Sequence, residues 1–564
     1  MVEREIPAGP TASNSEVDLL VIGSGTGMAA ALAANELGLD VLVVEKTEYV
    51  GGSTARSGGA FWIPPNQVLT EAGADNSADE VRSYLESLVG EDSARDRWEA
   101  FVTHGAEAVA MLERTTPMKF FWARYYSDYH PEHPGGSAEG RSCECLPFDA
   151  SLLGEERGRF RPGVMEAPVP MPVTGADYKW MNLIARRPLQ GVPRVTKRVI
   201  QGVGGKVLGR EYMAGGQALA AGMFAGLIRA QVPVWTRAQL TDLIVEEGRV
   251  VGAQIEQDGR EVQVRARRGV VLATGGFDHD LALRQQLQSP ILSEDLSLGS
   301  PGNTGDGIAA GQRVGAETKL MDQAWWFPSF APVGDGPVQI CLAERSLPGS
   351  LLVNDEGQRF INEATDYMSF GQRVLELADE GHPVGTMWLV FDKKYRDSYV
   401  LAGSLFPTMA IPQSWYDAGI AATGKTPREL AAGIGVPPEQ LEATLRRFNQ
   451  VANLGVDHDF GRGQSAYDRY YGDPTITPNP NLRPLKGTLY AVKMVLSDLG
   501  TCGGLVADAR GRVLGQDQQP IAGLYSLGNN AANVFGRSYP GAGATIGQGL
   551  VYGLIVAREA AANR

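Results

Sequence analysis

The stretch "VDLLVIGSGTGMAAALAANELGLDVLVVEK", residues 17–46, decides the fold. Its two apolar runs, 17–22 and 40–44, are typical of strands buried inside a parallel sheet. The segment between them, 29–37, is rich in helix-forming residues. The order strand, glycine turn, helix, strand predicts the start of a dinucleotide-binding domain.

The turn itself carries residues that suit a nucleotide. Gly23 permits a sharp bend, and Gly25 lets the backbone approach a pyrophosphate at the helix N-terminus. Glu45 follows the second strand, where an acid binds a ribose hydroxyl. The third glycine position holds Met28 instead, with Gly27 just before it. Because strand, turn, helix and acid agree, the pattern favours nucleotide binding over a purely structural turn.

Further glycine clusters follow along the chain. They are "EKTEYVGGSTARSGGAFW" (45–62), "RRGVVLATGGFD" (267–278), "NTGDG" (303–307) and "GLYSLGNNAAN" (523–533). Each one alone would indicate a plain turn. In this order they resemble the FAD-contacting segments of the fumarate reductase and succinate dehydrogenase flavoprotein superfamily.

The resemblance implies FAD as cofactor. Some relatives bind FAD covalently through a histidine after the "GGS" loop, but here that stretch reads Arg56-Ser57-Gly58, so we expect non-covalent FAD. The expected FAD-binding residues are Gly23, Ser24, Gly25, Gly27, Met28, Glu45, Lys46, Gly52, Ser53, Thr54, Ser57, Gly58, Gly59, Ala273, Thr274, Gly275, Asp306, Gly528, Asn529, Thr545 and Ile546.

The predicted fold class is α/β, with a two-dinucleotide-binding-type, Rossmann-like FAD domain and an inserted α+β catalytic domain. The turn signals "EEGR" and "QDGR" predict a β-meander over 240–272, and 427–455 reads as a pair of helices. The expected domains are the first part of the FAD domain, the catalytic domain and the C-terminal part of the FAD domain, at 1–299, 300–487 and 488–564. We expect a short flexible tail at the N-terminus.

Composition narrows the function classes. The 564 residues carry a net charge of −14, which argues against nucleic acid as a partner. The 4 cysteines and 6 histidines form no metal-ligand pattern, so we expect no metal. Free thiols, a polar N-terminus without a signal peptide and the lack of an 18-residue apolar run predict a cytoplasmic protein.

Tyrosine-bearing stretches mark a reaction site. "RSYPGAGATIG" (537–547) is too short and too glycine-rich for a stable helix or strand, yet it contains Tyr539 four residues before Gly543. With "SDY" (127–129), "AWWFP" (324–328), "RFINEATDY" (359–367) and "SDLGTCGG" (497–504), it resembles the 3-ketosteroid Δ1-dehydrogenase family over essentially the whole chain.

That resemblance implies a 3-ketosteroid substrate and an external electron acceptor such as a quinone or dye. Tyr367 is then the base for the proton on ring carbon 2, and Tyr129 supports it. Tyr539 and the Gly543 N–H hold the 3-ketone oxygen. The chemistry agrees, because two donors at that oxygen stabilise a developing enolate. Hydride from ring carbon 1 goes to flavin N5.

Other interpretations stay open. The chain is alternatively another oxidoreductase of the superfamily, for a different enone (including 3-ketosteroid Δ4-desaturation) or a dicarboxylate, or a flavin-binding protein without turnover. Arg359 is the visible carboxylate-binding candidate, without a histidine at a matching spacing. Tyr125 and Tyr126 are expected to be packing residues, and Cys502 a small filler near the cofactor. Trp325 and Trp326 either line an apolar steroid slot or pack the second domain.

Residues 179–210 contain eight basic residues and no acid. Apolar residues such as Trp180 and Ile184 lie among them. This segment is either a solvated or oligomer-contacting surface or an amphipathic patch that rests on anionic lipid, which would make the protein membrane-associated.

Overall fold

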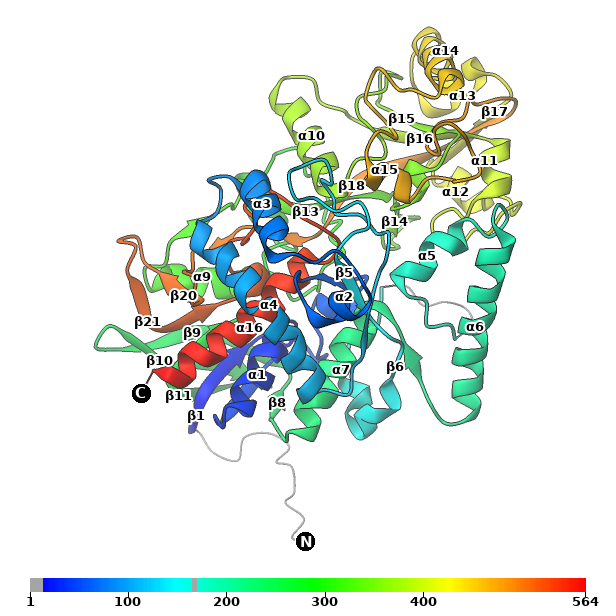
Figure 1. Ribbon diagram of the computed structural model, residues 1–564. Coiled ribbons are helices and arrows are strands. Elements are labelled where there is room, and N and C mark those ends of the chain that lie inside the picture. The colour runs from blue at the N-terminus through cyan, green and yellow to red at the C-terminus, as the bar shows by residue number, and fades with distance from the viewer. Residues whose placement is uncertain (1–13, 165–169, 564) are drawn as a thin grey trace.

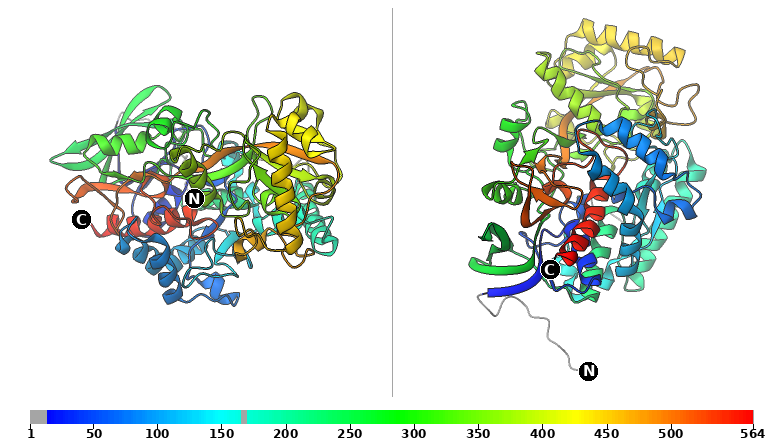
Figure 2. Two further views of the ribbon diagram at one scale, coloured as in Figure 1. Left: turned by 90° about the horizontal axis from the view of Figure 1, so that it is seen from above. Right: turned by 60° about the vertical axis from the view of Figure 1, so that its left-hand side comes forward.

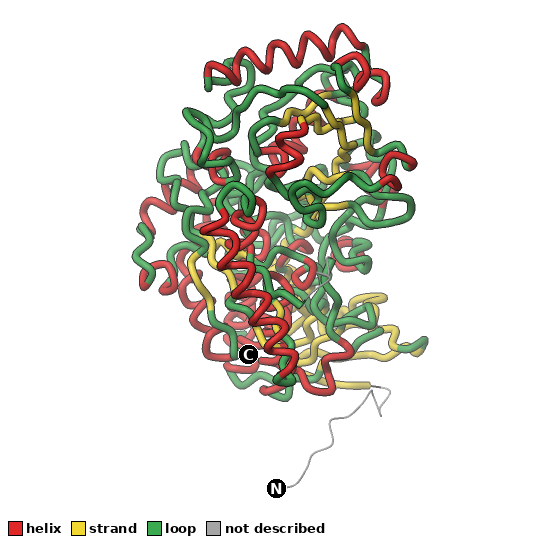
Figure 3. The backbone as a smooth tube through the Cα atoms, turned by 90° about the vertical axis from the view of Figure 1, so that its right-hand side faces the viewer, coloured by secondary structure: helices red, strands yellow, loops and turns green. Residues whose placement is uncertain are grey.

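The structure is a computed structural model, and it describes residues 14–164 and 170–563. The tail expected at the N-terminus lies outside the described residues up to position 13. Two sheets organise the chain, and Figure 3 shows the strands gathered in an upper and a lower group between helices. Figure 2 shows the halves built on these sheets side by side.

The first sheet has eight strands in the order β20-β21-β11-β1-β2-β8, with β10 and β9 added beyond β11. β1 lies inside it, parallel to both β2 and β11. Together with α1 this confirms the predicted strand, turn, helix and strand. The strands are β1 (Asn14–Ile22), β2 (Val41–Val44), β8 (Val234–Trp235), β9 (Ala238–Glu246), β10 (Arg249–Gln257), β11 (Arg260–Leu272), β20 (Arg512–Leu514) and β21 (Pro520–Ser526).

The predicted β-meander is also confirmed. β9, β10 and β11 pair in antiparallel fashion through tight turns. Unlike its neighbours, β11 then continues into the parallel part of the sheet. Its apolar end is buried, whereas its first half alternates between buried and exposed residues.

Helices cover one face of this sheet (Figure 1), where α1 and α16 contact the strands directly and α4 and α7 pack on α1. They are α1 (Gly27–Glu36), α4 (Arg95–Thr115), α7 (Gly215–Arg229) and α16 (Ala544–Ala562). The expectation that 537–547 forms no helix is wrong at its C-terminal end, because α16 begins at Ala544. Burial of Ala544, Ile546 and Gly547, with Gly547 packed on the backbone of Trp62, stabilises the glycine-rich first turn, although its intrinsic helix propensity is low.

The second sheet has six strands, in the order β14-β13-β18-β16-β15 with β17 beside β18. These are β13 (Ala324–Phe330), β14 (Gln339–Ile340), β15 (Ser350–Val353), β16 (Met387–Asp392), β17 (Ala421–Gly424) and β18 (Leu489–Thr501). The expected domain boundary at 487/488 is wrong, because β18 pairs with β13 and β16. The chain returns to the first half only after Thr501.

Helices surround the second sheet. α10 (Tyr367–Asp379) packs on β13, and α13 (Pro427–Ile434) with α14 (Pro438–Leu454) confirms the predicted helix pair. α5 (Gly175–Asn182) and α6 (Pro188–Val207) contain most of the basic segment and lie at the right-hand edge of Figure 1. Among the described residues, no helix combines the length and apolarity needed to cross a membrane.

Candidate active site

A cavity of about 1580 Å³ is lined by residues of both halves of the molecule. All expected FAD-binding residues except Gly27 and Met28 line it, as do Tyr129, Tyr367, Tyr539 and Gly543. We call the part around Gly23, Glu45 and Lys46 the nucleotide end, and the part around Tyr129, Tyr367 and Tyr539 the tyrosine end.

At the nucleotide end, the turn after β1 requires glycine. Gly23 has φ 110°, and a Cβ there would lie 2.0 Å from the Ala273 carbonyl oxygen, at the end of β11. Gly27 and Met28 are not part of the cavity wall. Met28 is fully buried in α1, and Gly27 allows α1 to pack closely on Val21. The position three residues after Gly25 therefore serves helix packing.

The carboxylate of Glu45 is fixed beside that turn. Ser24 Oγ donates to one carboxylate oxygen at 2.5 Å, and Thr47 donates to the other from its backbone N and its hydroxyl, at 3.0 and 2.8 Å. This orients the acid at the C-terminal end of β2, next to the N-terminus of α1. A ribose hydroxyl and a pyrophosphate are the groups such an arrangement suits.

The middle of the cavity joins distant segments. Lys46 Nζ lies 2.7 Å from a carboxylate oxygen of Asp306, the first residue of α9 (Asp306–Arg313). The side-chain oxygen of Asn529 accepts hydrogen bonds from Trp325 Nε1 and Thr545 Oγ1, each at 3.0 Å. These links hold the β2, α9 and α16 regions around one elongated cavity.

These contacts decide whether Trp325 and Trp326 line an apolar steroid slot or pack the interior of the protein. Trp325 and Trp326 are completely buried, and neither lines the cavity. Trp325 donates a hydrogen bond to Asn529 and packs edge-on against Tyr539, with the ring centroids 4.7 Å apart. Trp326 packs against α10 at Gly371. The next residue, Phe327, contributes to the cavity wall instead. Cys502 is buried and is not among the lining residues.

At the tyrosine end, three aromatic rings from three segments meet. The ring centroids of Tyr129, Tyr367 and Tyr539 lie 5.0 to 5.3 Å apart in each of the three pairs. The Tyr129 hydroxyl donates to the Tyr367 hydroxyl at 3.0 Å. All three residues are at most 5% exposed. We call these three residues the tyrosine cluster.

Each member is held by its own segment. Tyr129 lies in the loop between β4 (Phe120–Trp122) and β5 (Ser142–Cys145), and its backbone N donates to Pro540 O at 3.1 Å. Tyr367 is the first residue of α10, where the preceding Asp366 caps the helix. The loop that carries Tyr539 leads directly into α16.

Gly543 ends that loop, and its conformation excludes other residues. Its φ is 85°, and a Cβ would lie 1.9 Å from the backbone oxygen of Ala60. Burial raises the pKa of Tyr539, and hydrogen bonding from Tyr367 and from the Gly543 backbone N–H opposes that rise. The N–H of Gly543 is therefore directed at the Tyr539 hydroxyl, and both groups line the cavity as neighbouring hydrogen-bond donors.

Burial also governs the other two phenols. It raises the pKa of Tyr367 well above its ordinary value, although the hydrogen bond from Tyr129 acts in the opposite direction. It raises the pKa of Tyr129 as well. Both groups therefore carry their protons at neutral pH. Tyr367 can accept another proton only after it has lost its own.

The prediction that the neighbouring tyrosines pack is confirmed for Tyr126, whose ring stacks on that of Tyr470, and wrong for Tyr125. Tyr125 is 55% exposed and lies in a turn with φ 69°, so it does not pack in the core. Tyr126 is buried, but it also lines the cavity, and its hydroxyl lies 3.3 Å from that of Tyr129. No local pattern distinguishes these two adjacent tyrosines. The turn alone sends one outward and the other toward the site.

A dicarboxylate site finds no support in the position of Arg359. Its guanidinium is bound by the carboxylates of Glu363 and Asp457, at 2.7 and 2.8 Å. It is not among the residues that line the cavity. A doubly paired arginine outside the cavity is not available to a substrate.

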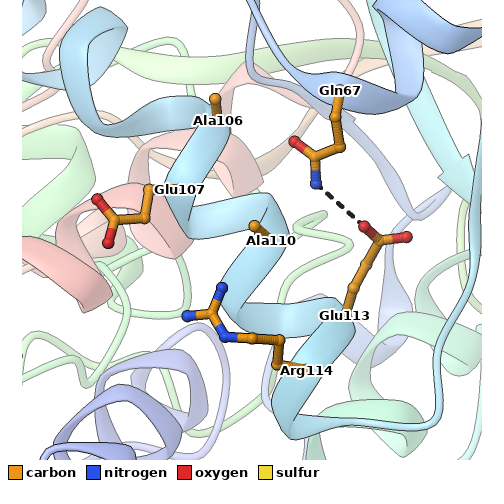
Figure 4. Close-up of a pocket in the computed structure, with 6 residues that line it drawn as sticks. All are labelled: Gln67, Ala106, Glu107, Ala110, Glu113 and Arg114. Atoms are coloured by element: carbon orange, nitrogen blue, oxygen red, sulfur yellow. Dashed lines mark hydrogen bonds between the residues drawn. The ribbon is translucent and has the colours of Figure 1, made fainter.

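A second hollow lies along α4 (Figure 4). Gln67 donates to Glu113 across it at 3.0 Å, Arg114 pairs with Glu36, and Glu107 pairs with Arg558. Each of its charged groups therefore already has a protein partner, and none of its residues belongs to the cavity described above.

Comparison with known proteins places the chain in a family. A family model described as "FAD binding domain" matches residues 18–546. A 3-oxosteroid 1-dehydrogenase of Mycolicibacterium smegmatis is 42% identical over 98% of both chains. A 4-oxocyclohexanecarboxylate 2-dehydrogenase of Sinomonas cyclohexanicum is 35% identical over 97% of this chain and 93% of its own.

A solved structure agrees with the sequence matches. It is a 3-ketosteroid Δ1-dehydrogenase from Sterolibacterium denitrificans in complex with 1,4-androstadiene-3,17-dione. It covers 98% of this chain and 100% of its own, with 36% identity and a TM-score of 0.90. The chain therefore belongs to the FAD-binding flavoprotein family that includes the 3-oxosteroid 1-dehydrogenases.

Proposed function

We propose that this protein removes hydrogen from carbons 1 and 2 in ring A of 3-ketosteroids, with FAD as the electron acceptor. The observation that carries the proposal is the tyrosine end of the cavity. Three phenols and the N–H of Gly543 converge there, from segments more than 200 residues apart in the case of Tyr129 and Tyr367. The sequence and structural relatives named above support the same reaction.

The cavity fits the cofactor at its nucleotide end. The turn at Gly23 and the N-terminus of α1 suit the pyrophosphate, and Glu45 suits the ribose. No histidine or cysteine is among the described residues that line the cavity, which supports non-covalent binding. When bound, FAD supplies the acceptor for a hydride.

The residues of the tyrosine end have separate roles in the reaction. The hydroxyl of Tyr539 and the N–H of Gly543 donate to the 3-ketone oxygen, which makes the proton on carbon 2 more acidic. Tyr367 takes that proton in its phenolate form and becomes a neutral phenol; the hydrogen bond that the Tyr129 hydroxyl donates to its oxygen stabilises that phenolate. Because the cluster is buried, these hydrogen bonds are not weakened by competing water.

The rest of the cavity suits an apolar skeleton. Its wall also includes the apolar residues Val338, Ile340, Leu342, Val400 and Phe406. A four-ring steroid gains free energy from such a surface, whereas a small cyclohexanone carboxylate would leave it uncovered.

Anaerobic mixing of the holoenzyme with androst-4-ene-3,17-dione tests the function. We expect bleaching of the flavin and formation of androsta-1,4-diene-3,17-dione, identified by mass spectrometry. 4-Oxocyclohexanecarboxylate and succinate serve as competing substrates. Bleaching by either of them, with none by the steroid, would contradict the proposal.

We also propose that the protein contacts an anionic lipid surface through α6. The outward side of this helix exposes Leu189, Ile200 and Val207, which are 86, 66 and 82% exposed. Exposed Lys197 and Lys206 flank this apolar stripe. An apolar face bordered by cations, without any acid from residue 179 to 210, is typical of helices that lie in a membrane interface.

The inner side of α6 links the proposed lipid contact to the active site. Val195, Val199 and Gly202 line the same cavity as the tyrosine cluster. A steroid dissolved in lipid would thus have a short path to the site. A lipid-soluble quinone is in turn a suitable external acceptor, because each turnover leaves the enzyme two electrons to pass on.

Pelleting with vesicles tests the contact. We expect binding to phosphatidylglycerol vesicles, and loss of binding in a Lys197→Glu/Lys206→Glu variant or an Ile200→Ser/Val207→Ser variant. Lys394→Glu/Lys425→Glu makes the same charge change at exposed positions outside α5 and α6 and should leave binding intact. Unchanged pelleting of the α6 variants, or loss of an oligomer in them without any vesicle binding by the wild type, would refute the lipid contact.

A further inference from the structure

The loops that carry Tyr129 and Tyr539 have to keep a fixed distance from each other. In the proposed reaction, Tyr367 with its supporting Tyr129 acts on carbon 2, while Tyr539 donates to the oxygen on carbon 3. Because these atoms belong to one rigid ring, a shift between the loops withdraws one group when the other is in contact. A misplacement of about 1 Å can slow a reaction about 100-fold. Residues that fix this distance therefore affect the rate without touching the substrate.

Tyr84 lies behind the tyrosine cluster and joins the two loops. It is completely buried and is not among the residues that line the cavity. Its hydroxyl donates to Pro540 O, directly after Tyr539, at 2.8 Å. The same hydroxyl accepts a hydrogen bond from the backbone N of His130, directly after Tyr129, at 3.2 Å. One phenol oxygen thus binds the residue that follows each of these two cluster members.

The surroundings of Tyr84 suit this role. Burial raises the pKa of Tyr84 well above its ordinary value, and the nearby carboxyl group of Asp128 adds to the rise, so the hydroxyl keeps its proton and donates it at neutral pH. Tyr84 belongs to α3 (Ala78–Val89), which packs closely on the Tyr129 loop at Gly135. A Cβ added to Gly135 would lie 2.1 Å from Glu80 O. The helix that carries Tyr84 is therefore itself fixed against this loop.

A second buried side chain connects the same two loops. Trp62, the last residue of β3 (Ala60–Trp62), donates from Nε1 to a carboxylate oxygen of Asp128 at 2.8 Å, in the loop of Tyr129. Its ring packs on Gly541 in the loop before α16, where an added Cβ would lie 2.4 Å from Trp62 Cδ1. Trp62 is completely buried and does not line the cavity. The two connections are thus independent of each other and of the substrate.

We propose that Tyr84 and Trp62 are positioning residues, which set the distance between the base and the ketone donors. This proposal rests on the roles of Tyr367 and Tyr539 in the proposed function. Tyr84 acts through hydrogen bonds to both loops, and Trp62 through one hydrogen bond and one packing contact. Their loss should slow the chemical step. The steroid concentration at half-maximal rate should change little, because apolar contacts of the ring skeleton dominate binding.

Tyr84→Phe removes one of the two connections with little other change. Pro540 O still accepts from the backbone N of Tyr129 at 3.1 Å, and the aromatic ring stays, so flavin content should match the wild type. With saturating androst-4-ene-3,17-dione in the absence of oxygen, all of the flavin should be reduced. We expect the rate constant to fall about tenfold, as for the loss of one buried hydrogen bond.

Tyr552→Phe is the matched control. Tyr552 is also a buried phenol of the first half, and its hydroxyl donates to a backbone oxygen, Arg97 O, at 3.0 Å. It does not line the cavity, and it joins neither of the two loops. Its flavin should be reduced at the wild-type rate.

A double variant separates positioning from a general structural effect. If Tyr84 acts by placing Tyr539, its loss should matter less once the hydroxyl of Tyr539 has been removed. We expect Tyr84→Phe to slow the Tyr539→Phe variant less than about threefold, against tenfold in the wild type. A tenfold loss in both backgrounds, an equal loss in Tyr552→Phe, or a wild-type rate in Tyr84→Phe would overturn the role of Tyr84.

Trp62→Phe tests the other connection, and it also serves if Tyr84→Phe yields no flavoprotein. It removes the hydrogen bond to Asp128 and keeps an aromatic ring against Gly541. We expect the same pattern, with a slower reduction in the wild-type background and a much smaller further loss in Tyr539→Phe. Equal losses in both backgrounds, or no loss in either, would overturn the role of Trp62.

The single variant Tyr539→Phe distinguishes the two levels of the account. If Tyr539→Phe is slow while Tyr84→Phe and Trp62→Phe match the wild type, the positioning is wrong and the proposed donor stands. If Tyr539→Phe reduces its flavin at the wild-type rate, the proposed donor is wrong, and the positioning proposal falls with it.

Discussion

The nucleotide end and the tyrosine end of the cavity are built from different parts of the chain. At the nucleotide end, the backbone geometry of adjacent elements forms the site: the turn at Gly23 and the end of β2 at Glu45 lie 22 residues apart. At the tyrosine end, side chains from distant segments form the site. Tyr129, Tyr367 and Tyr539 come from a loop of the first half, a helix of the second and the segment before α16.

This difference separates holding the cofactor from transforming the substrate. Changes at the nucleotide end should alter how much flavin is bound. Changes at the tyrosine end should alter how fast bound flavin is reduced. The following substitutions test whether the two ends are independent.

The largest effect is expected for Gly23→Ala. The new Cβ would lie 2.0 Å from the Ala273 carbonyl oxygen, and φ 110° is unfavourable for alanine. We expect purified protein without flavin, as measured by absorbance. Gly38→Ala is the control, because Gly38 also has a positive φ but a Cβ added there would meet no atom within 4 Å. Equal flavin loss in both variants would mean that strain, not the close approach, is responsible.

Tyr367→Phe should leave flavin content normal and remove most turnover. Loss of a general base costs roughly 100- to 10,000-fold in rate. Stopped-flow reduction under anaerobic conditions measures this directly. Rates close to the wild type would show that another group takes the proton.

A smaller loss of turnover rate is expected for Tyr539→Phe, since the N–H of Gly543 still donates to the ketone oxygen. Removal of one such donor slows the chemical step by about 100-fold. The matched control is Tyr552→Phe, whose hydroxyl bonds to Arg97 O in the α16 region outside the cavity. If Tyr539→Phe changed only flavin content, the donor role would be refuted.

The smallest of the four effects is expected for Glu45→Gln at the nucleotide end. The amide keeps the shape but lacks the charge that favours a ribose hydroxyl, so the Kd for FAD should rise about tenfold. The rate per bound flavin should not change. Glu48→Gln, at a half-exposed residue paired with Arg237, should have no effect on either quantity. A slower chemical step in Glu45→Gln would show that the ends are coupled.

The same contrast explains what the sequence could predict. Local patterns were sufficient for β1, α1 and β2, for the β-meander and for the α13–α14 pair, because each depends on neighbours in the chain. The domain boundary near residue 488 was misplaced, because β18 belongs to the second sheet only through pairing with distant strands. The start of α16 was missed because tertiary burial outweighs the low helix propensity of its first turn.

Site residues follow the same rule. The motif residues Gly23, Glu45 and Tyr367 line the cavity as expected. Met28 does not, since helix packing rather than the ligand sets the residue at its position. Tyr126 could not be identified from sequence as a residue of the cavity wall. The turn that directs it toward Tyr129, and Tyr125 toward solvent, has no recognisable residue pattern.

The central claim is that the tyrosine cluster acts on the carbon next to the ketone. Androst-4-ene-3,17-dione labelled with deuterium at carbons 1 and 2, mixed once with oxidised enzyme without oxygen, tests it most directly. The account predicts that each equivalent of bleached flavin yields dienone that has lost one deuterium from each labelled carbon. Bleaching with both labels retained, or loss at carbons 4 and 5 of a saturated analogue instead, would contradict it.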